Sequence, residues 1–244
     1  MRRWRHFGSG GGLVVPATDP NIASVVLLMG FPGSDGSASF VDESPAVHAI
    51  TAVGNAQVDT AEFKFGDSSL LLDGSGDRLT SADSADWDFG SGPFTVEAHV
   101  RFALTETAAN YLVSQWNSAD NNRAWGIQYF NNGWHFAYTT GGSNATAVTL
   151  SFAWTQSGGT WFHFALTRDG SGDVRAFVDG TQIGATQAAN VTIFDSNQPL
   201  WIGAIASSTP ANDFNGHMDE FRITKGVARY TANFTPPTAA YPRS

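Results

Sequence analysis

Apolar and polar residues alternate in short segments along most of the chain after residue 23, and turn-forming residues separate these segments. In residues 94–102 every second side chain is apolar, and the others, including Glu97 and His99, are free to face water. This period of two predicts a half-buried β-strand. The other clear strand segments are Ser24–Met29, Leu70–Leu72, Tyr111–Gln115, Trp125–Phe130, Trp134–Tyr138, Trp161–Arg168, Val174–Val178, Leu200–Ile202 and Met218–Thr224. The pattern predicts an all-β domain with two sheets.

One hairpin can be predicted down to its register, because Asn132-Gly133 is a strong signal for a two-residue turn. The predicted pairs are Asn131 with Trp134, Tyr129 with Phe136 and Ile127 with Tyr138. One face then carries Trp125, Ile127, Tyr129, Trp134, Phe136 and Tyr138, and the other carries Gln128, Phe130, His135 and Ala137. We expect the aromatic face to be buried. A second meander is predicted, with turns at residues 169–172 and 179–180.

The first 23 residues differ in composition from the rest of the chain. They begin with basic and aromatic side chains and continue with a glycine-rich run: Arg2, Arg3, Trp4, Arg5, Phe7 and residues 8–12. Such a segment has too little apolar surface to fold alone, so we expect residues 1–23 to form an N-terminal arm and residues 24–244 a single domain. The start shows no signal-peptide core, and the most apolar stretch, residues 22–31, is too short for a membrane-spanning helix.

The net charge and the cysteine content limit which partners the protein is expected to bind and in which cellular compartment it is expected to be made. The formal net charge is −9, and Lys occurs only at positions 64 and 225. An acidic domain is a poor match for nucleic acid, and membrane insertion is not expected. Cys is absent, so no disulfide stabilises the fold. We therefore expect synthesis in a cytoplasm, which is compatible with later release in an assembled particle.

The order and spacing of several sequence blocks resemble the concanavalin A-like or laminin G-like jelly rolls, especially those of tailed-bacteriophage virion proteins. The blocks are Val26–Phe31, Lys64–Gly66, Leu72–Asp77, Phe94–Ala98, Trp161–Gly170, Phe177–Gly180, Leu200–Gly203, Phe214–Thr231 and Asn233–Pro237. The resemblance covers about residues 24–242 and implies a two-sheet antiparallel jelly-roll sandwich, here with an extended N-terminal arm. Function does not follow from the fold alone, because this fold hosts lectins, glycanases, adhesion modules and inert particle proteins.

The chain lacks the cluster of two Glu and one Asp that the hydrolases of this fold carry on alternating strand positions. Glycoside hydrolysis usually needs two carboxyl groups about 5 to 9 Å apart. Glu97 and His99 lie two residues apart and form either an acid–base pair or a passive, exposed strand face, which we favour. Asp219 and Glu220 are adjacent and are expected to point to opposite faces. We find no Gly-x-Ser-x-Gly motif and no phosphate-binding loop. The sequence predicts that the protein is not an enzyme.

Two kinds of binding site have candidate residues. The resemblance implies a structural calcium ion at the edge of the sandwich, with Asp73, Asp77 and Asp219 as matching ligands, although Asp residues also cap turns and Pro32 replaces an acid of the phage proteins. A sugar site needs aromatic platforms with polar groups nearby. The candidates near loops are Trp87, Trp116, Asn121, Arg123 and Trp154, and the alternative for the tryptophans is a place over the end of the sandwich.

Two functions of different class follow. The first is a virion structural or decoration protein, of head or tail, that docks on other virion proteins through the arm and binds a host-surface glycan. Arg2, Arg3 and Arg5 would pair with acidic groups of a neighbouring subunit, and Trp4 and Phe7 would fill apolar pockets there. The second is a free carbohydrate-binding lectin. A homo-oligomer is compatible with both.

Overall fold

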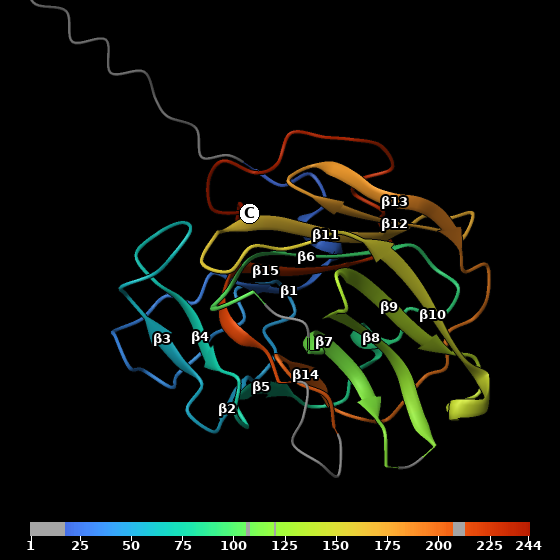
Figure 1. The fold of residues 1–244 in the computed structure, drawn as a ribbon, viewed down its shortest axis with the longest axis horizontal. Coiled ribbons are helices and arrows are strands. Elements are labelled where there is room, and N and C mark those ends of the chain that lie inside the picture. The colour runs from blue at the N-terminus through green and yellow to red at the C-terminus, as the bar shows by residue number, and fades with distance from the viewer. Residues whose placement is uncertain (1–17, 106–107, 120, 207–212) are drawn as a thin grey trace, which may run out of the picture.

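The computed structural model describes residues 18–105, 108–119, 121–206 and 213–244. These residues form two antiparallel sheets that pack face to face (Figure 1). The eight-stranded sheet has the order β13 (Thr181–Ala188), β12 (Asp173–Val178), β11 (Phe162–Arg168), β6 (Phe94–Phe102), β15 (Asn215–Lys225), β4 (Ser69–Asp73) and β3 (Gln57–Asp59), with β1 (Val25–Met29) also paired to β15. The seven-stranded sheet has the order β10 (Ala147–Ala153), β9 (Gly133–Thr139), β8 (Asn122–Phe130), β7 (Asn110–Asn117), β14 (Leu200–Ile202), β5 (Arg78–Ser81) and β2 (Thr51–Val53).

The all-β sandwich predicted from the sequence is confirmed. Helix in the described residues is limited to three short 3-10 turns, at Ile22–Ser24, Ala85–Trp87 and Asn144–Thr146. Sequence reasoning missed β2, β3, β5 and β10, of which three are only three or four residues long. Such short strands contain too few residues to show a period of two. Within the described part of the chain, no helix is long and apolar enough to cross a membrane.

The predicted hairpin has the right faces but the wrong register. Its two turn residues are Asn131 and Asn132, with φ angles of 48° and 57°, so Phe130 lies opposite Gly133 and Tyr129 opposite Trp134. Asn tolerates this left-handed conformation better than other side chains do, and a turn one residue earlier keeps the same side chains on the same face. The β12–β13 hairpin turns at Asp179-Gly180, as expected.

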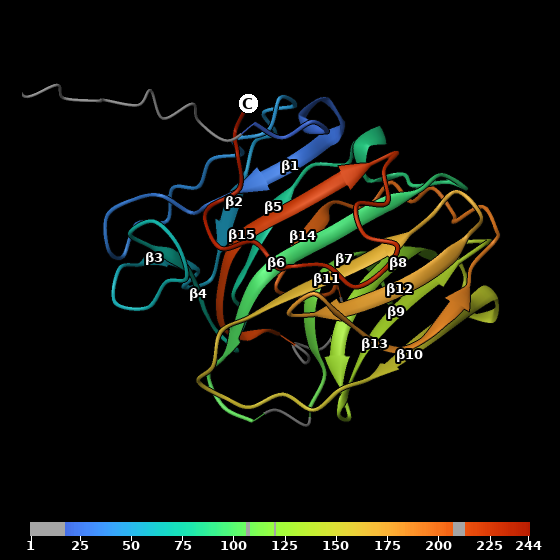
Figure 2. The same ribbon diagram turned by 90° about the horizontal axis from the view of Figure 1, so that it is seen from above.

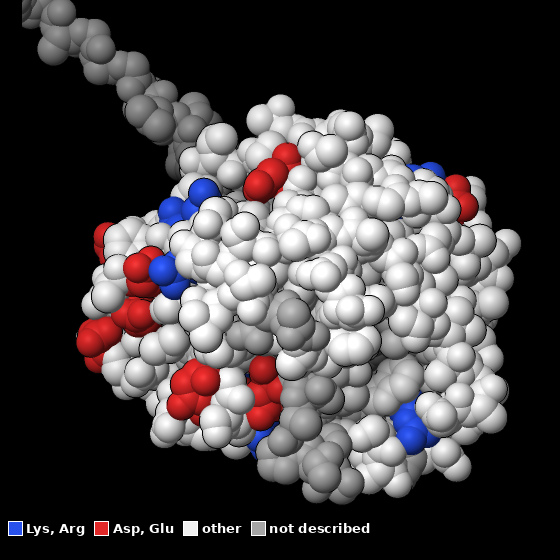
Figure 3. Space-filling model, in the orientation of Figure 1, with Lys and Arg blue, Asp and Glu red and all other residues white. Residues whose placement is uncertain are grey.

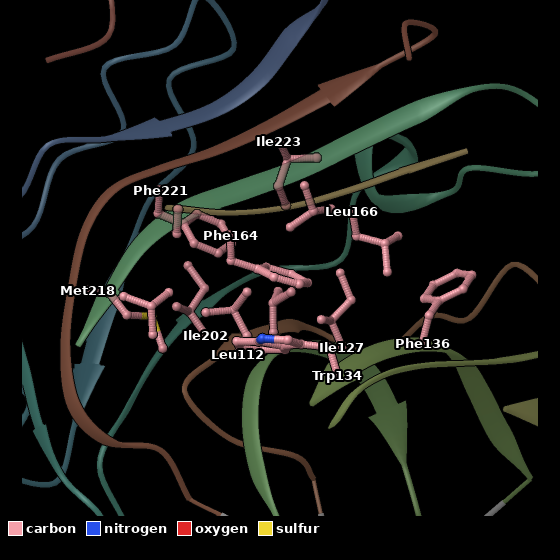
Figure 4. Packing of buried hydrophobic residues seen from close by; sticks show 14 of the residues in the cluster. Leu112, Ile127, Trp134, Phe136, Phe164, Leu166, Ile202, Met218, Phe221 and Ile223 are labelled. Carbon is pink, nitrogen blue, oxygen red and sulfur yellow. The ribbon is translucent and has the colours of Figure 1, made fainter. Parts of the chain in front are cut away.

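The core lies between the two sheets. Met218, Phe221 and Ile223 of β15 point from one sheet toward Ile127 and Trp134 of the other (Figure 4). The six aromatic and aliphatic side chains expected on the buried face of the β8–β9 hairpin all belong to this core: Trp125, Ile127, Tyr129, Trp134, Phe136 and Tyr138.

Strand β6 is buried on both faces, so the expectation of a half-buried strand is wrong. Thr95 and Glu97, which alternate with the core residues, have no exposed surface. The cover is the terminal segment, residues 226–244, which crosses the outer face of the eight-stranded sheet (Figures 1 and 2). The Tyr230 carbonyl accepts from the Thr167 hydroxyl at 2.8 Å, and the Val227 carbonyl accepts from the Thr95 hydroxyl at 3.0 Å. Alternation along a strand does not show what another part of the chain places over it.

Residues 18–23, which were expected to belong to the arm, pack on the same face. The Asp19 amide donates to the Ser244 carbonyl at 2.8 Å, so the start and the end of the described chain lie side by side. The Asp19 side chain is buried. The arm residues Arg2, Arg3, Trp4, Arg5 and Phe7 lie outside the described residues.

Candidate functional site

The outer face of the eight-stranded sheet carries a buried ionic network centred on Glu97. Oε1 of Glu97 accepts from Nε and Nη2 of Arg222 at 3.0 and 2.8 Å. Oε2 accepts from the Tyr230 and Tyr241 hydroxyls at 2.9 and 3.3 Å, and it lies 3.1 Å from Nε2 of His163. Burial opposes ionisation of Glu97, but Arg222, His163 and Arg229 outweigh it and hold the pKa of Glu97 well below its usual range.

The network also fixes the N-terminal segment. Asp19 accepts from Arg222 at 3.0 Å and from Arg229 at 3.0 and 2.7 Å. Burial opposes the charge of Asp19, yet the hydrogen bonds to Arg229 and Asn21 lower its pKa. Two carboxylates and two guanidinium groups therefore tie both terminal segments to β6 and β15. Removing one member of such a buried network leaves the remaining charges without a partner, which is strongly destabilising.

Glu97 and His99 are neither an exposed strand face nor a reactive pair. Both are buried, and Glu97 is saturated with donors. Burial, with the charge of His163, lowers the pKa of His99 to about 3, so His99 is neutral near pH 7. A substrate has no access to either group while the terminal segment is in place.

Asp219 and Glu220 do not point to opposite faces, because a β-bulge separates Asp219 from Arg222 in the pairing with β6. Glu220 has a φ of 49°, and both side chains leave the core face while Met218 and Phe221 fill it. Asp219 accepts from the backbone amides of Lys64 and Phe65 at 2.9 and 2.8 Å. Burial raises the pKa of Asp219 to about 6. Strict alternation fails wherever a bulge inserts an extra residue.

The three predicted calcium ligands are not brought together. Asp73 and Asp77 lie at the β4–β5 turn, where Asp73 accepts from the Ser75 amide at 2.9 Å and Asp77 from the Asp73 amide at 3.0 Å. Asp219 lies further along the sheet, opposite His99, whereas Asp73 is opposite Asn215. Over the described ranges, no group of three or more His, Asp or Glu side chains is placed to hold a metal ion. The two turn carboxylates cap backbone amides, the alternative considered from the sequence.

The tryptophans predicted as sugar platforms are mostly buried or packed against other side chains of the domain. Trp87 has no exposed surface, and its indole N–H donates to the Ala82 carbonyl at 3.0 Å, so it is wrong as a platform. Trp154 is half-buried and packs 4.7 Å from the Phe162 ring. Trp116 is 9% exposed, with the Arg123 guanidinium 6.0 Å from its ring centre. Asn121 is brought to this cluster, since its side-chain oxygen lies 3.5 Å from Arg123.

An accessible aromatic side chain with polar neighbours occurs elsewhere, at the β8–β9 turn. Phe130 is 44% exposed, and its ring lies 5.9 Å from that of His135. Beside it is a hollow of about 170 Å³, which we call the β8–β9 hollow. Its lining residues are Asn131, Asn132, Gly133, His135, Ser151, Phe152 and Ala153. Alternation along the hairpin predicts that Phe130 and His135 share the solvent face, whereas the residues predicted as sugar platforms were tryptophans.

The polar groups of the β8–β9 hollow are arranged to meet hydroxyl groups. Nε2 of His135 lies 2.9 Å from the Phe130 carbonyl, which only accepts, so Nε2 carries the proton. In the neutral ring Nδ1 then accepts from the Ser151 hydroxyl at 2.9 Å, which leaves the Ser151 oxygen as an acceptor. Asn131 and Asn132 are exposed and make no side-chain hydrogen bond to the described residues. The hollow thus offers amide donors and acceptors, and the exposed Phe130 ring lies next to His135, one of the lining residues.

Three larger hollows are less suited to a sugar. The first, of about 210 Å³, is lined by Asp19, Arg222 and Arg229, which already pair with one another in the ionic network. The two others are larger still. One of about 410 Å³ is lined by Glu43, Glu220 and Arg243, but Arg243 already pairs with Glu43 at 2.9 Å and with Glu220 at 2.7 Å. The other, of about 360 Å³, lies beside Asp73 and Asp77 and has no aromatic residue in its lining.

The fold is similar to those of several solved binding domains. The binding domain of paraclostridial mosquitocidal protein 1 is 16% identical with a TM-score of 0.65, and the match covers 84% of this chain and 50% of that one. The botulinum neurotoxin serotype G binding domain is 13% identical with a TM-score of 0.62, covering 83% and 48%. The receptor-binding domain of botulinum neurotoxin D is 15% identical with a TM-score of 0.61, covering 85% and 50%. The chain therefore spans about half the length of these structures.

Sequence similarity is more limited. No curated protein matches the chain. Residues 73–229 match the concanavalin A-like lectin/glucanases superfamily, and the region runs from the end of β4 to just beyond β15. The match covers more than half of the chain and agrees with the two-sheet sandwich. The protein belongs to the concanavalin A-like lectin/glucanases superfamily.

Proposed function

We propose that this protein is a non-catalytic carbohydrate-binding module and that the β8–β9 hollow is its sugar site. The observation that carries the proposal is the exposed Phe130 ring, which lies next to His135 of the hollow lining. With it come two exposed Asn side chains that make no hydrogen bond to the described residues and the free acceptor of Ser151. Aromatic side chains supply apolar contact area, and amides supply the paired donors and acceptors that hydroxyl groups require.

The carboxylates support a role without catalysis. Each of the described Glu residues is in an ion pair: Glu43 with Arg243, Glu62 with Arg101, Glu97 with Arg222 and Glu220 with Arg243. Asp219 has a raised pKa, as a catalytic acid would, but it has no exposed surface. A glycosidase needs two carboxyl groups that both reach the scissile bond, and the described Glu residues do not provide such a pair.

The structural neighbours are compatible with a binding role. They are binding or receptor-binding domains, and cell entry of botulinum neurotoxin type C depends upon interaction with two ganglioside molecules. That neighbour is 14% identical with a TM-score of 0.60. This likeness supports the fold as a scaffold for recognition, and the proposal for this chain rests on its own hollow.

Phe130→Ala should weaken glycan binding at least tenfold. The β8–β9 hollow is smaller than the roughly 300 Å³ of a drug-sized pocket, so it fits about one sugar residue. At about 0.3 kcal/mol per non-hydrogen atom, a hexose of about 12 such atoms binds with a Kd on the order of 1 mM. Glycan-array screening followed by NMR titration with the best oligosaccharide measures the change.

Val148→Ala is the matched control, because Val148 is 40% exposed on β10 but does not line the hollow. It should change the Kd by less than twofold. Equal affinities of Phe130→Ala and the wild type would place the sugar site elsewhere, and the Trp116–Arg123–Asn121 cluster would be tested next.

We also propose that residues 1–17 attach the domain to a larger assembly, such as the phage virion that the sequence resemblance implied. Thr18 lies with Asp19, Arg222 and Arg229 on the outer face of the eight-stranded sheet. Strands β8 and β9, which carry the hollow, belong to the seven-stranded sheet on the other side (Figure 1). Attachment on one side would leave the sugar site facing outward. Many copies in one particle would raise a millimolar affinity through avidity.

A chain beginning at Thr18 should melt within about 2 °C of the full chain and lose incorporation into particles when co-expressed with the other particle proteins. A chain beginning at Asn21 would also lack Asp19, which pairs with Arg222 and Arg229. A loss of incorporation could then come from lower stability and not from the missing arm. Equal incorporation of both chains would contradict attachment through the arm and favour the free lectin.

A further inference from the structure

The lining of the β8–β9 hollow and the strands around it contain no Asp, Glu, Lys or Arg apart from Arg123, which lies far from the hollow. Strands β9, β10 and β13 have no Asp, Glu, Lys or Arg. Charged groups are dense on the left of the view in Figure 3 and sparse on the right, where these strands lie. The single charge on β8 is Arg123, seven residues from Phe130 and so about 23 Å away at about 3.3 Å per residue.

Arg123 is also unavailable to a ligand in the hollow. Its Nη2 donates to the Ser118 carbonyl at 2.6 Å, and its guanidinium lies over Trp116 at the opposite end of β8. An acidic sugar bound at Phe130 would therefore lose part of its hydration without gaining a cation, which is costly. The formal charge of −9 adds a repulsive field for anions.

We infer that the β8–β9 hollow selects neutral sugar residues and rejects sialylated, uronate and sulfated ones. This inference rests on the proposed function and names its ligand class. The hydrogen-bonding groups of Asn131, Asn132 and Ser151 match hydroxyl and acetamido groups, which both donate and accept. They offer no counter-charge to a carboxylate or sulfate.

The test uses the full-length chain on an array of neutral oligosaccharides of glucose, galactose, mannose and N-acetylhexosamines, with sialylated and sulfated derivatives of the same chains. The best neutral ligand and its singly sialylated derivative are then titrated by NMR. We expect the derivative to bind at least tenfold more weakly. The Kd of the neutral ligand should change less than twofold between 50 and 500 mM NaCl, because no ion pair is screened.

Ala153→Lys provides a gain-of-function arm. Ala153 is exposed and lines the hollow, so a lysine there brings the missing cation to the site. The ratio of the affinity for the sialylated derivative to the affinity for the neutral ligand should rise at least fivefold. Thr51→Lys adds the same charge on β2, at the opposite edge of the seven-stranded sheet, and should change neither affinity.

The outcomes separate the inference from the proposed function. Preference of the wild type for acidic glycans, lost in Phe130→Ala, would overturn the neutral-ligand inference and keep the sugar site. A steep loss of neutral-ligand affinity with salt would also overturn it. Binding of no oligosaccharide at 10 mM would overturn both.

Discussion

Glu97→Gln should lower the free energy of unfolding by about 3–5 kcal/mol, because it removes one charge from a buried ionic network. Arg222 would lose the negative charge that lies 2.8 Å from its Nη2, and the Tyr230 and Tyr241 hydroxyls would lose an ionised acceptor. Urea denaturation followed by tryptophan fluorescence and circular dichroism measures the change. The sequence had suggested a passive strand face, for which the same substitution would be neutral.

Glu62→Gln is the matched control. The Glu62 side chain is 45% exposed and lies 3.5 Å from Arg101, so its loss should cost at most about 1 kcal/mol. A similar cost for both variants would contradict the network as a major source of stability.

The pH dependence gives a second measure of the same network. The folded-state pKa of Glu97 lies below its ordinary value of 4.5, so its contribution is complete above pH 4.5 and is lost as the pH falls below that value. The difference between wild type and Glu97→Gln should therefore shrink below pH 4.5, by up to about 1.4 kcal/mol per pH unit. A difference that stays constant down to pH 3 would mean that the charge of Glu97 does not stabilise the folded protein.

Tyr241→Ala should also cost about 3–5 kcal/mol, although Tyr241 lies beyond residues 73–229, which match the superfamily. The ring is buried against Val25 and Leu28 of β1, and the Arg222 guanidinium lies 3.8 Å from the ring centre. Loss of the ring would open a cavity over β1 and expose the ionic network to water. The same denaturation experiment measures the effect.

Tyr241→Phe separates packing from hydrogen bonding, since it keeps the ring and removes only the hydroxyl contacts to His163 and Glu97. Its cost should be about 1.5–3 kcal/mol, the range for hydrogen bonds to charged groups. Thr238→Ala, an exposed change in the same segment, should cost less than about 0.5 kcal/mol. A cost below 1 kcal/mol for Tyr241→Ala would show that the terminal segment is a loose cover.

Part of the candidate sugar site could be predicted from the sequence. Alternation along the β8–β9 hairpin placed Phe130 and His135 on the solvent face, and this assignment is confirmed. The hollow itself depends on the exact turn at Asn131 and Asn132 and on Ser151, which comes from β10, a strand that the sequence did not reveal. Residue type alone does not predict that Phe130 is exposed and Trp87 is buried, because both are aromatic residues next to turns.

The sequence by itself determined the all-β class, the faces of its longer strands and the two-sheet sandwich, because side-chain period and turn chemistry are local properties. Only the tertiary structure decided the role of Glu97, whose partners Arg222, Tyr230 and Tyr241 are 125, 133 and 144 residues away in sequence. It also decided that a bulge turns Asp219 and Glu220 to one face and that Asp219 lies apart from Asp73 and Asp77. Contacts between distant segments depend on how strands are ordered in the sheets, and no local pattern encodes that order.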